Sequence, residues 1–182
     1  MFSTTSPTML ALRGLTRRLG INAVLGKLLA RDGYEAKLSS AMLASVRPGD
    51  RVWDVGANIG YYTIQFEQLV GPKGRVYAFE PSSVNRTRLE ARIGSTDRVR
   101  LLAVGLSNAS GHACLQQGAD DIGATSRIVS DVAKGEPGVE HVPLVAGDEL
   151  VARGDVEAPN FIKIDVEGFE YEVLQGLRNT LA

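Results

Sequence analysis

The sequence predicts an α/β fold built on a mostly parallel, buried sheet. From residue 51 onward, short apolar runs alternate with segments of helical period. The clearest of these runs are RVWDVG (51–56), RVYAFE (75–80) and FIKID (161–165). Such runs, separated by helices, are typical of strands that are covered on both faces.

Turn residues separate the predicted elements in the first half of the chain. Pro48-Gly49 ends one helix and Gly71-Pro72 ends the next, because neither pair continues a helix easily. The predicted helices cover residues 34–46, 60–70 and 81–93. The predicted strands cover residues 51–56, 75–80 and 99–107.

The pattern changes after residue 110. Residues 111–117 and 139–146 are predicted as short strands, and the segment 118–138 between them is rich in Gly, Asp and Ser. A long polar loop inside a compact domain is usually functional or disordered, so we predict a mobile flap beside a site. Strand 161–165 then resumes the parallel pattern, and residues 169–177 are predicted to be helical.

The composition is that of a globular protein without nucleic-acid-binding character. Of 182 residues, 44% are hydrophobic and 23% charged, and the net charge is −1, without the basic excess of a nucleic-acid binder. The single cysteine, Cys114, rules out an internal disulfide and fits a reducing, cytoplasmic location. No apolar run approaches the roughly 18–20 residues of a membrane span.

The N-terminal stretch differs from the rest of the chain. Residues 1–31 hold five cations and no acid, and apolar residues 21–29 have the spacing of an amphipathic helix. We interpret residues 1–33 as a helical preface that packs on a domain spanning 34–182. Transit-peptide and membrane-surface roles are the alternatives.

A first chemical constellation lies where strand 51–56 meets the next helix. Gly56 and Gly60 allow a sharp turn and a close approach of a ligand to backbone N–H groups. Asp54 precedes the turn, where it would repel a pyrophosphate and attract an ammonium or sulfonium. Glu80 ends the second strand, where a carboxylate can accept hydrogen bonds from both ribose hydroxyls. Together these features favour S-adenosylmethionine as the ligand.

Two other interpretations of this turn stay open. The glycines and Asp54 would in one case only shape and cap a tight turn. In the other the chain would be a nucleotide-dependent oxidoreductase, although its spacing is G-x-N-x-G and not the dinucleotide fingerprint G-x-G-x-x-G.

Four stretches resemble the FkbM-type S-adenosylmethionine-dependent methyltransferases. They are PGDRVWDVGANIGYYT (48–63), VYAFEP (76–81), LSNASG (106–111) and IKIDVEGFEYEVLQG (162–176). The resemblance implies a Rossmann-like, doubly wound sheet of class I methyltransferase type, and O-methylation of a hydroxyl on a small metabolite or glycan. It places the cofactor on Asp54, Gly56, Asn58, Gly60 and Glu80.

The chain departs from that family after its fourth parallel strand. FIKIDVE (161–167) matches this strand, and the last three of the family's seven strands have no counterpart. An open sheet edge at 161–165 would invite association. We therefore expect a truncated chain, or a partner or second copy that covers this edge. The alternative function is a non-catalytic cofactor-binding remnant or subunit that needs a partner to complete its site.

The charged cluster after strand 161–165 is the candidate catalytic region. Asp165 and Glu167 would orient or deprotonate a substrate hydroxyl, and Lys163 and Asp165 are spaced to pair on one face. A magnesium site is a weaker alternative, and no metal is predicted. In a purely structural alternative, Glu167 and Glu170 favour the start of the next helix.

Four further residues are weaker candidates. His112 and His141 are predicted to be structural, because no partner is placed beside them. Thr125 and Ser126 in the flap are plausible substrate contacts.

Overall fold

The structure is a computed structural model that describes residues 36–116, 127–129 and 139–182. The chain divides into two units, Met1–Ser45 and Val46–Ala182. In the first unit, the described residues form a helix over residues 36–45, within the predicted helix 34–46. The preface 1–33 lies outside the described residues, so it stays a prediction.

Four parallel strands form the main sheet of the second unit, in the order β3-β2-β1-β8. They are β1 (Arg51–Val55), β2 (Arg75–Phe79), β3 (Val99–Leu102) and β8 (Phe161–Ile164). The chain builds outward from β1 to β3 and returns to place β8 on the other side of β1. This is a topological switch point, where open α/β sheets bind ligands beyond the carboxyl ends of their strands. The predicted α/β fold with a parallel sheet is confirmed.

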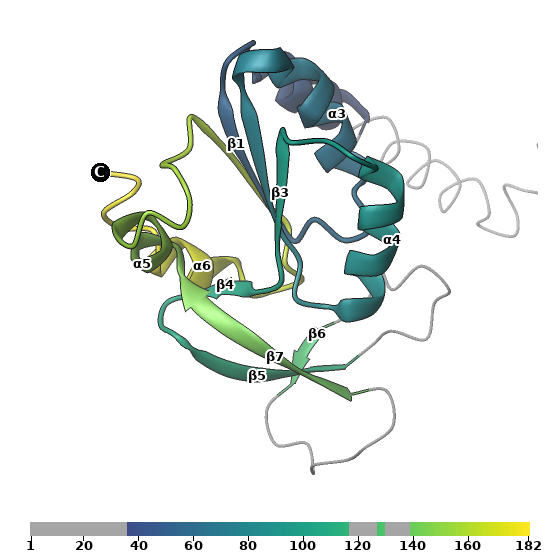
Figure 1. Ribbon diagram of the computed structural model, residues 1–182. Helices are drawn as coiled ribbons and strands as arrows, with labels where there is room; N and C mark the ends of the chain where they lie inside the picture. The colour runs from purple at the N-terminus through teal and green to yellow at the C-terminus, as the bar shows by residue number, and fades with distance from the viewer. Residues whose placement is uncertain (1–35, 117–126, 130–138) are drawn as a thin grey trace, which may run out of the picture. The chain divides into compact units, whose positions relative to one another are not determined.

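Helices lie on both faces of this sheet, because side chains alternate along each strand. Asp54 on β1 faces α3 (Tyr61–Val70), whose Thr63 donates a hydrogen bond to it. Its neighbour Trp53 belongs to a buried cluster with side chains of α5 (Gly147–Ala152) and α6 (Glu170–Gln175). Figure 1 shows α3 and α4 (Ser83–Ile93) on one side of the sheet and α5 and α6 on the other.

A second, mixed sheet has the order β4-β7-β5-β6. Its strands are β4 (Gly105–Ser107), β5 (Gly111–Gln116), β6 (Arg127–Val129) and β7 (Val139–Ala146). The predicted strands 111–117 and 139–146 are confirmed, whereas β6 falls within the segment 118–138 that was predicted as a loop. The rest of that segment lies outside the described residues.

The prediction of one strand over residues 99–107 is wrong. The run forms β3 and then β4, which pair with different sheets. A Cβ on Gly105 would lie 2.9 Å from Leu144 Cδ2, so the glycine lets β4 lie tightly against β7. Hydrophobicity is continuous across the break, which is why the sequence pattern did not reveal it.

Within the described residues, β8 is an edge of the parallel sheet. All four of its residues are half-buried, so the edge is partly accessible. A partner or second copy over this edge stays a prediction. No helix in the described part of the chain has the length and apolar character needed to cross a membrane.

Candidate functional site

The turn after β1 is held against the end of β2 by its backbone. The N–H groups of Gly56 and Ala57 both donate to the carbonyl of Phe79 at 3.1 Å. Gly56 has φ +74°, and a Cβ there would collide with the carbonyl oxygen of Asp165. Only glycine therefore allows this turn to pass so close to the segment after β8.

Glu80 lies where β2 ends and is 5% exposed. One carboxylate oxygen, Oε2, accepts a hydrogen bond from the N–H of Asn58 at 2.8 Å, and Oε1 accepts one from the N–H of Ser82 at 2.9 Å. Burial raises the pKa of Glu80 above its usual value, although these hydrogen bonds favour the charged form. The site thus keeps a buried carboxylate beside the turn 56–60.

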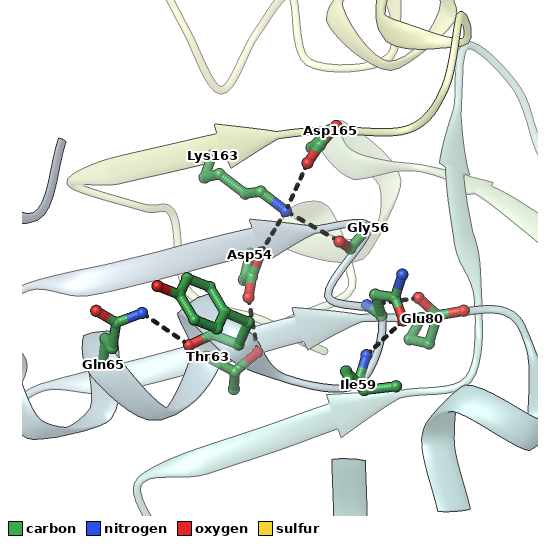
Figure 2. A network of polar contacts seen from close by, with 10 residues as sticks. Asp54, Gly56, Ile59, Thr63, Gln65, Glu80, Lys163 and Asp165 are labelled. Atoms are coloured by element: carbon green, nitrogen blue, oxygen red, sulfur yellow. Dashed lines mark hydrogen bonds and ion pairs between the residues drawn. The ribbon is translucent and has the colours of Figure 1, made fainter. Parts of the chain in front are cut away.

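Lys163 joins three parts of the site (Figure 2). Its ammonium lies 3.1 Å from Asp54 Oδ1, donates to the carbonyl of Gly56 at 3.0 Å, and lies 3.7 Å from Asp165 Oδ2. The Lys163 side chain is 9% exposed and that of Asp54 is fully buried. The predicted pairing of Lys163 with Asp165 is confirmed, and the closer contact with Asp54 is a further finding.

The two candidate catalytic acids lie on an exposed segment after β8. The side chain of Asp165 is 65% exposed, and Glu167 is also exposed, with φ +49°. Such a left-handed conformation is uncommon outside glycine and occurs often at functional sites. By contrast, Glu170 accepts a hydrogen bond from the N–H of Gly168, and backbone N–H donors lower its pKa. Glu170 therefore stabilises the start of α6.

A pocket of about 250 Å³ lies at the carboxyl ends of β1, β2 and β8. The second sheet contributes Leu106 and Leu115 to its apolar wall. Five predicted site residues line this pocket, namely Gly56, Asn58, Glu80, Asp165 and Glu167.

Two predicted site residues lie outside the pocket lining. Asp54 is buried beneath Lys163, and Gly60 lies where a Cβ would collide with Leu89. Lys163 reaches the pocket in place of Asp54, and Asn85 of α4 also lines it. Asn85 was not predicted as a site residue, because it belongs to no motif and only the first turn of α4 places it beside Glu80.

The charges around the pocket favour a cationic ligand. Glu80, Asp165 and Glu167 contribute three carboxylates, and Lys163 is the cation among the lining residues. Because the charge of the Lys163 ammonium is already balanced by Asp54, the carboxylates make the electrostatic potential in the pocket negative. A sulfonium or ammonium would be attracted and a phosphate repelled.

The weaker candidates lie away from this pocket. His112 is on β5 and His141 on β7, where the His141 ring lies 3.7 Å from Cys114 Sγ. Neither histidine lines the pocket. Thr125 and Ser126 lie outside the described residues. No three His, Cys, Asp or Glu side chains of the described segments are grouped so that they could hold a metal ion.

Comparison with known proteins shows which family the chain matches. A family model described as the methyltransferase FkbM domain matches residues 54–182. The chain is 32% identical over 178 residues to the hexuronic acid methyltransferase AglP of Haloferax volcanii, covering 97% of this chain and 70% of AglP. It is 27% identical over 150 residues to the 2-O-methyltransferase NoeI of Sinorhizobium fredii, covering 74% of this chain and 60% of NoeI.

A solved structure supports the fold. The FkbM methyltransferase of Methylobacillus flagellatus matches with a TM-score of 0.51 and 21% identity. The match covers 73% of this chain and 30% of that chain, so the present chain spans less than a third of the solved protein.

Proposed function

Because the chain belongs to the FkbM methyltransferase family, we propose that it transfers a methyl group from S-adenosylmethionine to a hydroxyl of a small metabolite or glycan. The observation that carries this proposal is Glu80, a buried carboxylate that lines the pocket beside a glycine turn. A carboxylate at the end of the second strand is suited to bind ribose hydroxyls.

The residues of the pocket fit this cofactor. Glu80 would accept hydrogen bonds from the ribose, and the turn 56–60 would allow close approach of the ligand to the backbone. The carboxylates of Asp165 and Glu167 would attract the positive sulfonium and amino groups. The cofactor itself would supply an electrophilic methyl group.

In this proposal the chain holds the acceptor hydroxyl in line with the methyl group of the cofactor and takes the hydroxyl proton. In-line transfer requires the hydroxyl oxygen to be held about 3 Å from the methyl carbon. Asp165 and Glu167 are the candidates for the carboxylate that would take the proton of the acceptor hydroxyl when the bound cofactor supplies its methyl group. A positioned base typically contributes about 10²–10⁴-fold to the rate.

The acceptor class is supported by the relatives. AglP is named for a hexuronic acid and NoeI for 2-O-methylation. We therefore place a sugar hydroxyl first among the candidate acceptors.

Calorimetric titration with S-adenosylhomocysteine, the demethylated product, tests the cofactor assignment. Replacing Glu80→Gln should weaken binding about tenfold to a hundredfold, because hydrogen bonds to a charged group contribute about 1.5–3 kcal/mol. The matched control is Glu90→Gln on the exposed surface of α4. If the wild type does not bind, the proposed function is wrong; if Glu80→Gln binds as the wild type does, the assignment of Glu80 is wrong.

Transfer of labelled methyl groups tests the acceptor. Incubation with methyl-labelled S-adenosylmethionine and a panel of uronic acids, neutral sugars and their glycosides should label at least one hydroxyl. Label that appears only on the carboxylate of the uronic acids, as a methyl ester, would contradict transfer to a hydroxyl.

A further inference from the structure

The pocket has two ends, because the strands that carry most of its polar lining lie in the order β2-β1-β8. Glu80 follows β2, whereas Asp165, Glu167 and Phe169 follow β8. With the ribose held by Glu80, an acceptor hydroxyl beside the candidate bases Asp165 and Glu167 lies at the β8 end. We call this side of the pocket the acceptor end.

Tyr61 carries an exposed aromatic ring at this pocket. It is the first residue of α3, directly after the turn 56–60, and it lines the pocket while remaining 60% exposed. Its ring lies in a T-shaped contact with the ring of Tyr62, with 4.9 Å between the centroids, and Tyr62 stacks on the buried Phe66. Tyr61 is therefore held in place by its neighbour, while most of its surface stays accessible to a ligand.

Phe169 brings a second aromatic ring to the pocket from the β8 side. It is the N-cap residue of α6 and is half-buried. Glu167 and Gly168 before it both have a positive φ, +49° and +89°, so the chain turns sharply between Asp165 and Phe169. This one short segment thus lines the pocket with two carboxylates and an aromatic ring. Tyr61 joins them from the helix after β1, the strand next to β8.

Aromatic rings and carboxylates in one pocket are suited to bind a sugar ring. A pyranose has faces of C–H groups and an edge of hydroxyls. The face of an aromatic ring is partly negative and attracts C–H groups, whereas a carboxylate accepts hydrogen bonds from hydroxyls. An open-chain polyol has no flat C–H face, so it would gain from the carboxylates alone.

We propose that Tyr61 and Phe169 form an acceptor subsite that binds the C–H face of a pyranose, while Asp165 and Glu167 accept hydrogen bonds from its hydroxyls. The two rings then determine specificity for a cyclic sugar over an open-chain polyol. This assignment rests on the proposed function, since it takes a sugar hydroxyl as the methyl acceptor.

Binding of sugars to the protein saturated with S-adenosylhomocysteine tests the subsite without requiring turnover. The probes are the methyl glycosides of glucose, mannose, galactose and glucuronic acid, with sorbitol as the open-chain comparison, and each is titrated by NMR. At least one glycoside should bind more tightly than sorbitol, with its C–H resonances shifted upfield by the aromatic rings. Tyr61→Leu and Phe169→Leu should each weaken its binding about threefold to tenfold, because leucine is apolar but has no aromatic face. Tyr61→Phe keeps the ring and should bind within about twofold of the wild type.

The matched control is Tyr171→Leu, because Tyr171 is 68% exposed on α6 and does not line the pocket. Its glycoside affinity should equal that of the wild type, and all variants should bind S-adenosylhomocysteine as the wild type does, which also shows that they fold. Should Phe169→Leu fail to fold, Phe169→Met takes its place.

Each other result overturns the assignment. If either Leu variant at the subsite binds the glycoside as tightly as the wild type, that ring does not contact the sugar. If Tyr61→Phe loses as much affinity as Tyr61→Leu, the phenol hydroxyl makes the contact and stacking is wrong. A wild type that binds S-adenosylhomocysteine but no glycoside, or sorbitol equally well, contradicts the subsite alone. A wild type that does not bind S-adenosylhomocysteine removes the proposed function as well, so the two failures are distinguishable.

Discussion

Lys163 can lie inside a strand because its ammonium pairs with Asp54, the residue directly opposite it on β1. A buried charge is costly unless it is paired. Here the ammonium also donates to the carbonyl of Gly56 and lies over the ring of Tyr62, 5.5 Å from its centroid. The hydroxyl of Thr63 donates a hydrogen bond to the other oxygen of Asp54, Oδ2, at 2.6 Å. The pair therefore joins the sheet to the turn that forms the pocket.

Removing only one partner of this pair should be strongly destabilising. We expect Lys163→Met to lower the free energy of unfolding by about 3–5 kcal/mol, because it leaves the Asp54 carboxylate buried and uncompensated. The double variant Lys163→Met/Asp54→Leu should recover part of the loss. Urea denaturation of the two single variants, the double variant and the wild type measures the coupling. Additive losses would show that the two charges do not depend on each other.

Gly56 should be more sensitive to substitution than Gly49, although both have a positive φ. A Cβ at Gly56 would collide with the backbone of Asp165, whereas a Cβ at Gly49 meets nothing within 4 Å. Gly49→Ala should therefore cost about 1–2 kcal/mol, the penalty of the left-handed conformation. Gly56→Ala should cost more and should also weaken binding of S-adenosylhomocysteine. Thermal denaturation and calorimetry compare the two, and equal losses would contradict the close approach to Asp165.

Two of the predicted site residues that line the pocket, Gly56 and Glu80, lie next to strand ends. Gly56 and Glu80 are recognisable because glycine and an acid follow directly on apolar runs. The contact between Lys163 and Asp54 was not predictable in the same way, since it depends on the register of two strands 109 residues apart in the chain. In the sequence, the only indication of this contact is that one lysine and one aspartate each stand inside an apolar strand.

Among the helices and strands, the well-predicted elements have both a strong pattern and a clear end signal. α3 ends at the Gly71-Pro72 pair, and α4 begins after the capping residue Ser82. α5 was not predicted, because a six-residue helix that begins with Gly147 has neither the length nor the period to be recognised. Strand period also does not show which sheet a strand joins, and therefore the break between β3 and β4 was missed.

Asp148 on α5 holds the segment that follows α6. Its carboxylate accepts hydrogen bonds from the N–H of Asn179 at 2.9 Å, and from the N–H and hydroxyl of Thr180 at 2.8 and 2.6 Å. Burial raises the pKa of Asp148, but these hydrogen bonds outweigh it and the net effect is a lowered pKa. The charged form is therefore stabilised by folding.

Asp148→Asn should lower stability in a pH-dependent way. Because folding lowers the pKa of Asp148, its contribution is fully present above the unfolded value of about 3.9 and is lost as the pH falls through the folded pKa. We expect a loss of about 1 kcal/mol at neutral pH, since the site is partly exposed. Urea denaturation between pH 7 and 3 should show the difference shrinking toward acid. Asp97→Asn on the surface is the control, and a loss that is constant with pH would contradict the mechanism.

At the scale of the whole second unit, the pocket is shared by the two sheets. Its floor comes from the ends of β1, β2 and β8, and part of its wall from Leu106 on β4 and Leu115 on β5. Glu140 on β7 adds a link, because its carboxylate accepts from the N–H of Ser83 at the start of α4, 3.0 Å away. A ligand in the pocket would therefore contact elements of both sheets.

Cofactor binding should consequently stabilise both sheets together. At a hundredfold excess over Kd, S-adenosylhomocysteine should add about 2.7 kcal/mol to the free energy of unfolding. For a chain of this size that corresponds to a rise in Tm of about 5–10 °C. Hydrogen exchange should slow at the turn 56–60 and also in β5, because the ligand would lie against both. The rise in Tm should be much smaller in Glu80→Gln. Protection confined to the parallel sheet would show that the second sheet takes no part in binding.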